Sequence, residues 1–456
     1  MLFNSFSYLV FLPVVFLAYH CAPNSKASGI LLVASSLFYA AFVPAYLLIL
    51  LALICVHYWG ARAIERSGKP QVRRSLVVAC VLLTLATLVT FKYLDWLLGG
   101  VPGLPRPLAL PLPLGLSFHS LQAISYVLDV YHGKIRAERR VVVFANYVMF
   151  FPQAVAGPIE RGDHLLPQLQ SRRTPRDKDL REGISLILLG LVRKCMIADV
   201  VGTVVDRVFS NVAISSTLDI LVAAGGFGIQ IYSDFAGYSL IAQGSALLFG
   251  IRLGDNFDRP YLSTDVSRFW RRWHISLSSW FRDYVYVPLG GSRQGLVGEG
   301  FAVLVVFLLS GLWHGANLTF IAWGLWHALA LIAHRLWIRF RPNGMRLPSS
   351  LGWFLTFTTA QLGWIFFRAS SLDEATHAFR ILWAGRCWPA VLPVSGMWQV
   401  VALGAASFLL DAVARVPALQ VPGWSRPMRW ATYYLAIGAL FWWGRFGELK
   451  FIYFQF

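Results

Sequence analysis

The chain has 456 residues, of which 57% are hydrophobic and 14% are charged. Soluble proteins are apolar over about half of their sequence or less, so this composition excludes a soluble globular protein and predicts a polytopic membrane protein. The formal net charge of +18 would suggest nucleic-acid binding in a soluble domain. Here Lys and Arg lie in short segments between apolar runs, so we expect no nucleic-acid partner and interpret these segments as cytoplasmic loops beside membrane lipid.

The apolar runs, taken in chain order, predict about ten or eleven transmembrane helices, because about 20 apolar residues cross roughly 30 Å of hydrocarbon. The first run, from Phe3 to His20, has no cation before it, and we interpret it as a retained helix rather than a signal peptide. Pro44 is expected to break the second run. The predicted spans lie near residues 4–21, 29–58, 75–98, 114–132, 184–205, 219–251, 301–316, 318–338, 350–367, 396–414 and 429–446.

The segments between these runs set the expected topology. Residues 99–115 and 210–219 hold one cation between them and are expected outside. Residues 141–163 are apolar but broken by prolines and glycine, so we predict a re-entrant hairpin. The expected fold is an all-α helical bundle with re-entrant and interfacial helices, forming a single integral-membrane domain over residues 1–456. The expected cytoplasmic loops, where cations collect, are residues 62–74, 134–140, 172–181, 252–293 and 335–346.

Residues 255–300 are the most informative polar segment, and we expect them at the cytoplasmic interface. Large apolar residues recur there at helical spacing and predict one amphipathic helix. Such a helix is either a plain membrane anchor or the mouth of a site. In the second interpretation, Arg271, Arg272 and His274 hold an acidic acyl donor, such as a coenzyme A phosphate or a carrier-protein surface. The residues at helical spacing are Trp270, Trp273, Leu277, Trp280, Phe281 and Tyr284.

His314 lies inside the apolar stretch LLSGLWHGANLTFIAWGLWHAL, residues 308–329. An imidazole at membrane depth usually faces a cavity or a bundle interior. Gly311 and Gly315 beside it allow another backbone or a substrate to approach closely. Spacing alone leaves two interpretations open, a catalytic base at the end of a tunnel and a hydrogen-bonded core histidine.

We expect no metal site. On one continuous helix His314 and His327 would lie about 20 Å apart, at 1.5 Å per residue, so they would share an ion only if the helix breaks near Asn317. The five cysteines are scattered without disulfide or zinc spacing. The sequence also lacks GxSxG, HExxH, Walker A and GxGxxG motifs, which excludes most hydrolase, zinc-protease, nucleotide-driven and dinucleotide-dependent functions.

These segments together resemble the membrane-bound O-acyltransferase superfamily and, within it, the bacterial alginate O-acetylation group. The most specific part is a long block at residues 256–291 followed by Trp313, His314 and Gly315. The resembling segments are SYVLDVYHG (125–133), FFPQAVAGPIER (150–161), GLVRKCMIAD (190–199), YSDFAGYS (232–239), NFDRPYLSTDVSRFWRRWHISLSSWFRDYVYVPLGG (256–291), GLWHGANLTFIAWG (311–324) and the terminal FIYFQF.

The resemblance implies a helical fold around a central tunnel, with His314 as the catalytic residue at its constriction and His274 at the cytoplasmic entrance. It implies transfer of an acetyl group from acetyl-CoA or another acyl thioester, without a bound cofactor, across the bacterial inner membrane. The acceptor that the resemblance implies is a secreted polysaccharide such as alginate. It is reached directly or through a periplasmic acetyltransferase partner and the polysaccharide export and synthesis machinery.

The chemistry that we expect at His314 is general base catalysis, because a hydroxyl becomes a good nucleophile only when its proton is removed. Candidate oxyanion donors are the Trp313 indole, the Asn317 amide and a backbone N–H near Gly315. The terminal FIYFQF resembles the end of a partner peptide in a related D-alanylation system. Its last residue, Phe456, has no hydroxyl, so we favour aromatic packing over an acyl relay that would have to use Tyr453.

Two other classes of function stay open at this point. A proton-coupled transporter or flippase would use His314 as a coupling site, but transporters usually carry carboxylates near the membrane midplane. We expect Asp129, Asp199 and Asp234 near segment ends, which disfavours transport. A scaffold that anchors a soluble acetyltransferase would need residues 255–300 but no histidine. Among acceptors, cellulose, another exopolysaccharide and peptidoglycan stay open beside alginate.

Overall fold

The computed structural model describes residues 1–99, 113, 115–154, 157–342, 345–387, 390–413, 424–446 and 452. Every regular element within these ranges is helical, which confirms the all-α prediction. The chain forms two compact units. Unit 1 comprises residues 1–190 and 238–255, and unit 2 comprises residues 191–237 and 256–456. Most of the expected outside loop at 99–115, and Tyr453 and Phe456 of the terminal FIYFQF, lie outside the described residues.

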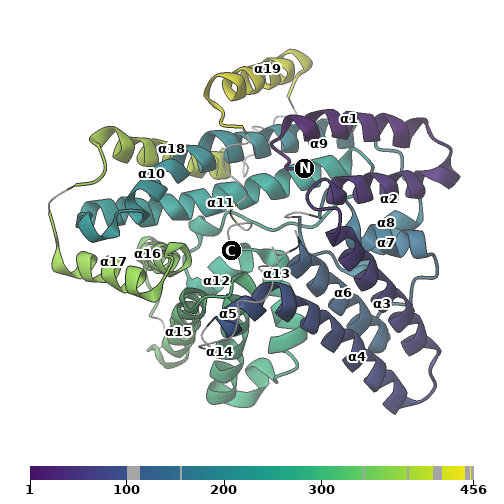
Figure 1. The fold of residues 1–456 in the computed structure, drawn as a ribbon. Helices are drawn as coiled ribbons and strands as arrows, with labels where there is room; N and C mark the ends of the chain where they lie inside the picture. Colours follow the sequence, from purple (N-terminus) through teal and green to yellow (C-terminus); the bar gives the residue numbers. More distant parts are fainter. Residues whose placement is uncertain are drawn as a thin grey trace. The chain divides into compact units, whose positions relative to one another are not determined.

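Unit 1 contains a group of three helices, α3, α4 and α6, that contact one another and lie side by side in Figure 1. α2 ends at Ala40 and α3 begins at Tyr46, which confirms the predicted break at Pro44. The helical elements of unit 1 are α1 (Phe6–Cys21), α2 (Asn24–Ala40), α3 (Tyr46–Arg66), α4 (Pro70–Leu88), the π-helical turn η1 (Val89–Tyr93), α5 (Leu94–Leu98), α6 (Leu116–Tyr131), α7 (Val141–Met149), α8 (Gly162–Gln170) and α9 (Asp177–Leu191).

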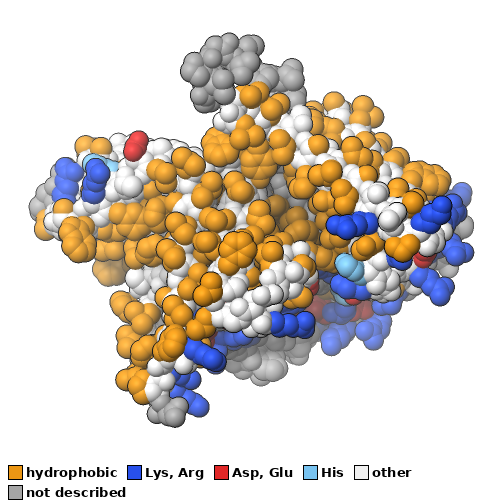
Figure 2. Space-filling model, turned by 90° about the horizontal axis from the view of Figure 1, so that it is seen from below, with side chains coloured by type: hydrophobic (Ala, Val, Ile, Leu, Met, Phe, Trp, Pro, Cys, Tyr) orange, Lys and Arg blue, Asp and Glu red, His pale blue; other side chains and the backbone are white. Residues whose placement is uncertain are grey.

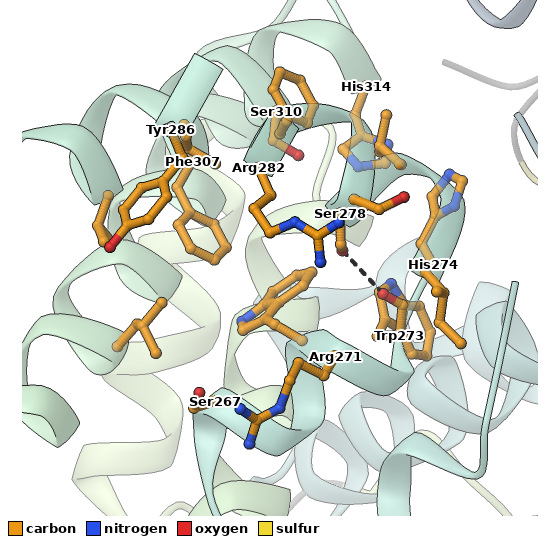
Figure 3. A pocket seen from close by; sticks show the side chains of 18 of the residues that line it. Ser267, Arg271, Trp273, His274, Ser278, Arg282, Tyr286, Phe307, Ser310 and His314 are labelled. Carbon is orange, nitrogen blue, oxygen red and sulfur yellow. Dashed lines mark hydrogen bonds between the residues drawn. The ribbon is translucent and has the colours of Figure 1, made fainter. Parts of the chain in front are cut away.

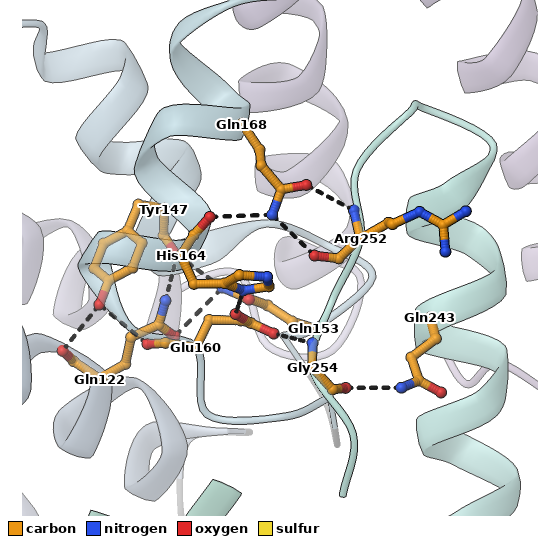
Figure 4. Close-up of polar contacts among 9 residues, drawn as sticks. All are labelled: Gln122, Tyr147, Gln153, Glu160, His164, Gln168, Gln243, Arg252 and Gly254. Carbon is orange, nitrogen blue, oxygen red and sulfur yellow. Dashed lines mark hydrogen bonds and ion pairs between the residues drawn. The ribbon is translucent and has the colours of Figure 1, made fainter. Parts of the chain in front are cut away.

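The segment expected to re-enter the membrane begins with α7, which has nine residues. At 1.5 Å per residue it extends about 13 Å, too little to cross roughly 30 Å of hydrocarbon. The buried Glu160 follows it (Figure 4): Oε1 accepts from the Gly254 N–H at 2.6 Å, and Oε2 pairs with His164 Nδ1 at 2.6 Å. Gln168 extends this network to the backbone of Arg252. These hydrogen bonds hold residues 160–168, which follow α7, against residues 252–254, which follow α11.

Unit 2 holds the remaining helices, including α17, which the apolar runs did not predict. α11 is divided between the two units. The elements are η2 (a π-helix, Val192–Ala198), α10 (Asp199–Phe209), η3 (Val212–Ile214), α11 (Thr217–Leu247), η4 (Pro260–Leu262), α12 (Val266–Arg272), α13 (Ile275–Phe281), η5 (a π-helical turn, Arg282–Tyr286), η6 (Gly291–Gln294), α14 (Gly295–His314), α15 (Leu318–Phe340), α16 (Ser349–Arg368), α17 (Leu372–Ala384), α18 (Val394–Val413) and α19 (Arg426–Trp443).

Much of the surface is apolar, and Figure 2 shows hydrophobic side chains over most of one face, with Lys and Arg gathered in a few places. A helical protein presents such a surface to lipid, so the chain is a multi-pass membrane protein. Six described helical segments are long and apolar enough to cross a membrane. This is fewer than the segments expected from sequence, because some, such as the 16-residue α6, are shorter. The six are Tyr46–Arg66, Pro70–Leu98, Thr217–Leu247, Gly291–His314, Leu318–Phe340 and Val394–Val413.

The interfacial segment is not the single amphipathic helix that its aromatic spacing predicts. α12 ends at Arg272 and α13 begins at Ile275, and between them His274 adopts the left-handed region at φ 41° and ψ 57°. Trp273 and Leu277 are buried. The periodicity therefore reflects two short helices whose apolar residues pack into unit 2, and the prediction of one surface helix is wrong.

Asp234 lies near the middle of α11 and is 2% exposed, so the expectation that the acidic residues lie near segment ends is wrong for this residue. Its Oδ1 is 2.9 Å from Nζ of Lys194 in η2, and the same Nζ is 2.7 Å from Asp199 Oδ1. The preceding residue, Arg193, pairs with Asp411 of α18 at 2.5 Å. Buried charges require such partners, and these pairs connect η2 to three other helices, α10, α11 and α18.

Candidate active site

A cavity of about 310 Å³ lies within unit 2, between the loop segment that holds α12, α13 and η5 and the helices α14 and α15. Its volume is at the lower end of the range for small-molecule sites, roughly 300–1,000 Å³. The wall is mainly apolar, with Trp270, Phe307 and Leu331 among its residues. Both histidines that the sequence singles out, His274 and His314, also line it, and Figure 3 shows them along one side.

His314 is the last residue of α14 and is 5% exposed. The helix ends there because Gly315 is fully extended and Asn317 begins the cap of α15. The rings of Trp323 and Phe367 each meet the imidazole edge-on, with centroids 5.0 Å away. The aromatic contacts and the helix end fix the imidazole in the cavity wall rather than against lipid.

His274 occupies a left-handed backbone conformation, which is unfavourable for a residue other than glycine and needs support from its surroundings. Asn256 supplies it, since its carbonyl accepts from the Ile275 N–H at 2.9 Å and its Oδ1 accepts from the Ser276 hydroxyl at 2.6 Å. The imidazole is 1% exposed and lies edge-on to Phe235. Burial lowers the pKa of His274 to about 3, so its imidazole is neutral near pH 7.

Trp313 connects the two histidines. Its ring centroid is 5.9 Å from that of His274 and 4.9 Å from that of His314. Trp313 is itself buried and is not part of the cavity wall. The structure thus brings together His274, Trp313 and His314, which the sequence analysis singled out. The indole of Trp313 contacts both imidazoles.

Three arginines line the cavity, and they differ in how their charges are balanced. Arg335 pairs with Glu299, and Arg282 pairs with Asp283 at 2.8 Å. Arg271 is exposed and has no ion-pair partner among the residues that the structure describes. The uncompensated positive charge of this wall is therefore at Arg271.

Arg272 and Asn317 lie outside the cavity wall. The guanidinium of Arg272 faces Asp258, with Nε 3.8 Å from Oδ2. Asn317 Oδ1 accepts from the Thr319 N–H at 3.1 Å, and its Nδ2 donates to the Ser370 carbonyl at 2.8 Å. Both side chains contact neighbouring parts of the chain and neither lines this cavity, and their contact with a substrate stays a prediction.

The helix breaks at Asn317, as the sequence analysis allowed, so the separation of about 20 Å calculated for His314 and His327 on one helix does not apply. Both imidazoles contact the indole of Trp323, with centroid distances of 5.0 and 5.1 Å. Within the described part of the chain, no group of three or more His, Cys, Asp or Glu side chains is arranged to hold a metal ion.

Comparison with known proteins assigns the chain to a family. Residues 140–369 match the membrane-bound O-acyltransferase family, and this range contains every residue of the cavity wall. The chain is also 35% identical over 402 residues to the probable alginate O-acetylase AlgI of Pseudomonas aeruginosa, covering 85% of this chain and 76% of that protein. The chain belongs to the membrane-bound O-acyltransferase family.

Two further relatives of this O-acyltransferase have different names. The peptidoglycan O-acetyltransferase of Helicobacter pylori is 33% identical over 417 residues, covering 83% of this chain and 79% of that protein. The teichoic acid D-alanyltransferase of Streptococcus thermophilus is 29% identical over 281 residues, covering 56% and 68%. The resemblance seen in the sequence is thus confirmed, and the protein is an enzyme of acyl transfer rather than a transporter or a scaffold.

The O-acyltransferase cavity also contains polar residues that the sequence analysis did not assign to a site. Ser310 precedes His314 by four residues on α14, so helical spacing alone places it on the same face. Ser278 lines the wall too, and its hydroxyl donates to the Trp273 carbonyl at 3.1 Å, as Figure 3 shows. The sequence did not predict that Arg335 lines the cavity, because its position there depends on how α15 packs against α14.

Proposed function

We propose that this O-acyltransferase takes an acetyl group from a cytoplasmic acyl thioester and passes it across the bacterial inner membrane for O-acetylation of an exported polysaccharide. The observation that carries the proposal is one cavity wall with His314 of the WHG segment, the buried His274 and the uncompensated Arg271. The names of the relatives support a polymer acceptor. We favour alginate or a similar exopolysaccharide, reached through a periplasmic acetyltransferase partner and the export machinery, over peptidoglycan or cellulose.

In this proposal His314 is the general base. Its imidazole takes the proton of the acceptor hydroxyl while the oxygen attacks the thioester carbonyl, and the same proton then goes to the leaving thiolate. A carbon–oxygen bond forms, the carbon–sulfur bond breaks, and the base is regenerated. Such proton transfer contributes about two to four powers of ten to the rate. The ring of His274 contacts Trp313, which in turn contacts His314, so we assign His274 to positioning His314 through this indole.

The donor is the second part of the proposal. An acidic donor such as acetyl-CoA matches a wall whose exposed Arg271 has no anionic partner among the described residues. Trp270 also lines the cavity, and its indole N–H is buried without an acceptor within the described chain, so we propose the thioester oxygen as its acceptor. We therefore assign oxyanion stabilisation to Trp270 instead of Asn317, whose amide is already engaged.

Polymer acetylation by the His314→Ala variant, at matched membrane abundance, tests the proposal. We expect a loss of about two to four orders of magnitude in the acetylation rate. The matched control is His327→Leu: His327 is buried against the same Trp323, lies off the cavity, and its ring nitrogens have no partner among the described residues. This control should keep its activity. Wild-type acetylation by His314→Ala would refute the assigned mechanism.

A further inference from the structure

A second cavity, of about 720 Å³, lies entirely within unit 1. It is enclosed by the end of α1, the start of α2, the start of α7 and the end of α8, and its wall includes Arg140 and Arg172. The volume falls within the range of ligand-binding sites, roughly 300–1,000 Å³. Acyl transfer, as proposed above, makes no use of this cavity.

Arg172 provides a fixed positive charge in the wall. Its Nη1 donates to the Ala22 carbonyl at 2.7 Å and to Asn24 Oδ1 at 3.0 Å, and its Nη2 donates to the His20 carbonyl at 3.0 Å. The guanidinium also lies over the Tyr19 ring at 4.9 Å. These partners orient the guanidinium but are uncharged, and no carboxylate pairs with Arg172 among the described residues. The cation is therefore held in place without being neutralised.

Arg140 adds a second positive charge. Its side chain is 56% exposed, and its Nη2 donates to the Gln170 carbonyl at 3.1 Å. The nearby acid is Glu138, whose Oε1 is 3.7 Å from Arg140 Nε. The carboxylate of Glu138 already accepts from the backbone N–H groups of Arg139 and Arg140 and from Gln170 Nε2. Since those donors share its charge, Glu138 compensates Arg140 only in part.

The remaining wall mixes apolar residues, among them Val141 and Leu169, with polar side chains that can donate hydrogen bonds to an anion. It includes Asn24, Ser25 and Ser28 at the start of α2 and Gln168, which appears in Figure 4. The 17-residue α2 begins without a side-chain cap, so its dipole adds to the positive potential that the two arginines create. The cavity thus offers charge and donors to a phosphate group.

The outer faces of α1 and α2 are apolar, which suits a phosphate group that is attached to lipid tails. Val14 and Leu17 on α1, and Val33 and Leu37 on α2, are strongly exposed, as expected of helix faces that contact lipid tails. Arg140 and Arg172 belong to basic segments that the positive-inside bias assigns to the cytoplasmic side, where the leaflet is rich in anionic lipid. We propose that this cavity binds the phosphate of an anionic phospholipid, with its acyl chains along the exposed faces of α1 and α2.

Binding of phosphatidylglycerol to the full-length protein, measured by native mass spectrometry in detergent, tests this site. The wild type should retain phosphatidylglycerol more strongly than phosphatidylcholine. Arg140→Gln and Arg172→Gln should each weaken retention about fivefold, the factor that corresponds to about 1 kcal/mol per cation near a membrane surface. Arg173→Gln is the matched control, because Arg173 is exposed, adjacent in sequence and outside the cavity wall. It should bind like the wild type.

Two further arms keep the test decisive. Arg172→Gln removes hydrogen bonds that hold the chain, so Ser25→Phe, which fills the cavity while keeping both charges, should weaken retention as well. Inorganic phosphate and coenzyme A, added as competitors, separate a lipid site from a site for soluble phosphate. Unchanged lipid retention in both Arg140→Gln and Ser25→Phe would overturn the proposal. Displacement of the lipid by either soluble competitor at equal concentration would overturn it too.

Discussion

Gly311 of α14 is a position where a single methyl group should disable the enzyme without touching a reacting residue. A Cβ built there would lie 2.3 Å from the Phe320 carbonyl oxygen of α15, whereas ordinary contact begins at 3.4 Å. The contact is reciprocal, because a Cβ at Gly324 would lie 2.3 Å from the Phe307 carbonyl oxygen. The difference between 3.4 and 2.3 Å means that Gly311→Ala must separate the two helices by about 1 Å.

The expected consequence is a loss of stability and a larger loss of activity. Overpacking of this kind costs about 1–3 kcal/mol in the free energy of unfolding. His314 follows Gly311 by three residues on the same helix, so its imidazole would move with α14. A displacement near 1 Å at a reacting group lowers the rate by about a hundredfold. We expect kcat for acetyl transfer to fall while KM for the donor changes little, together with a lower Tm.

Gly300→Ala is the matched control on the same helix, because the nearest atom to a Cβ there is 4.0 Å away. Alanine is favoured over glycine in a helix by up to about 1 kcal/mol, so this variant should keep its activity and hold or raise its Tm. Wild-type kcat and Tm in Gly311→Ala would refute the steric argument. Equal losses of kcat and Tm in both variants would show that any substitution of glycine in α14 has this effect, and that the contact with α15 is not the cause.

Three other perturbations have expected outcomes. Arg271→Gln should raise KM for acetyl-CoA about fivefold, a modest factor because the side chain is exposed, and donor titration of Arg272→Gln should show a smaller change. The hydrogen bond that His164 donates to Glu160 raises the pKa of His164 above its ordinary 6.5, so the stability from this pair is present below pH 6.5 and is lost as pH rises through the raised pKa. The Tm difference between wild type and His164→Asn should therefore shrink from about pH 6 to about pH 9, and a difference that grows would contradict the pairing. Lys194→Met leaves two buried carboxylates without their cation and should cost about 3–5 kcal/mol in denaturant unfolding, and a cost below about 1 kcal/mol would show that the pair contributes little.

Local sequence rules predicted the elements whose causes are local. Apolar runs of sufficient length marked the helices, Pro44 marked the break between α2 and α3, and Asn317 marked the break between α14 and α15. The two candidate histidines were also found from sequence, one from its placement in an apolar run and both from the family resemblance. The structure then placed His274 and His314 in one cavity wall.

Features that depend on distant residues were not predicted. The turn at His274 is stabilised by Asn256, which accepts hydrogen bonds from Ile275 and Ser276. Helical periodicity cannot predict such a contact between residues that are distant in sequence. In the sequence Asp234 is an isolated acidic residue in an apolar run, because its ion-pair partner Lys194 lies 40 residues earlier in the chain (234 minus 194). The different environments of Arg271 and Arg272 likewise follow from where Asp258 lies, not from their own positions.

The π-helix η2 has a consequence for how unit 2 assembles in a bilayer. Its adjacent residues Arg193 and Lys194 reach carboxylates on two different helices, Asp411 of α18 and Asp234 of α11. In hydrocarbon an aliphatic helix face gains little free energy when it exchanges lipid contacts for contacts with another helix. Apolar surfaces alone therefore specify poorly which helices become neighbours. Two consecutive cations with two separate counterions specify which helices associate and in what rotation. Loss or insertion of one residue within this turn would turn one of the cations away from its counterion, so the segment should tolerate substitution of its apolar residues far better than a change in its length.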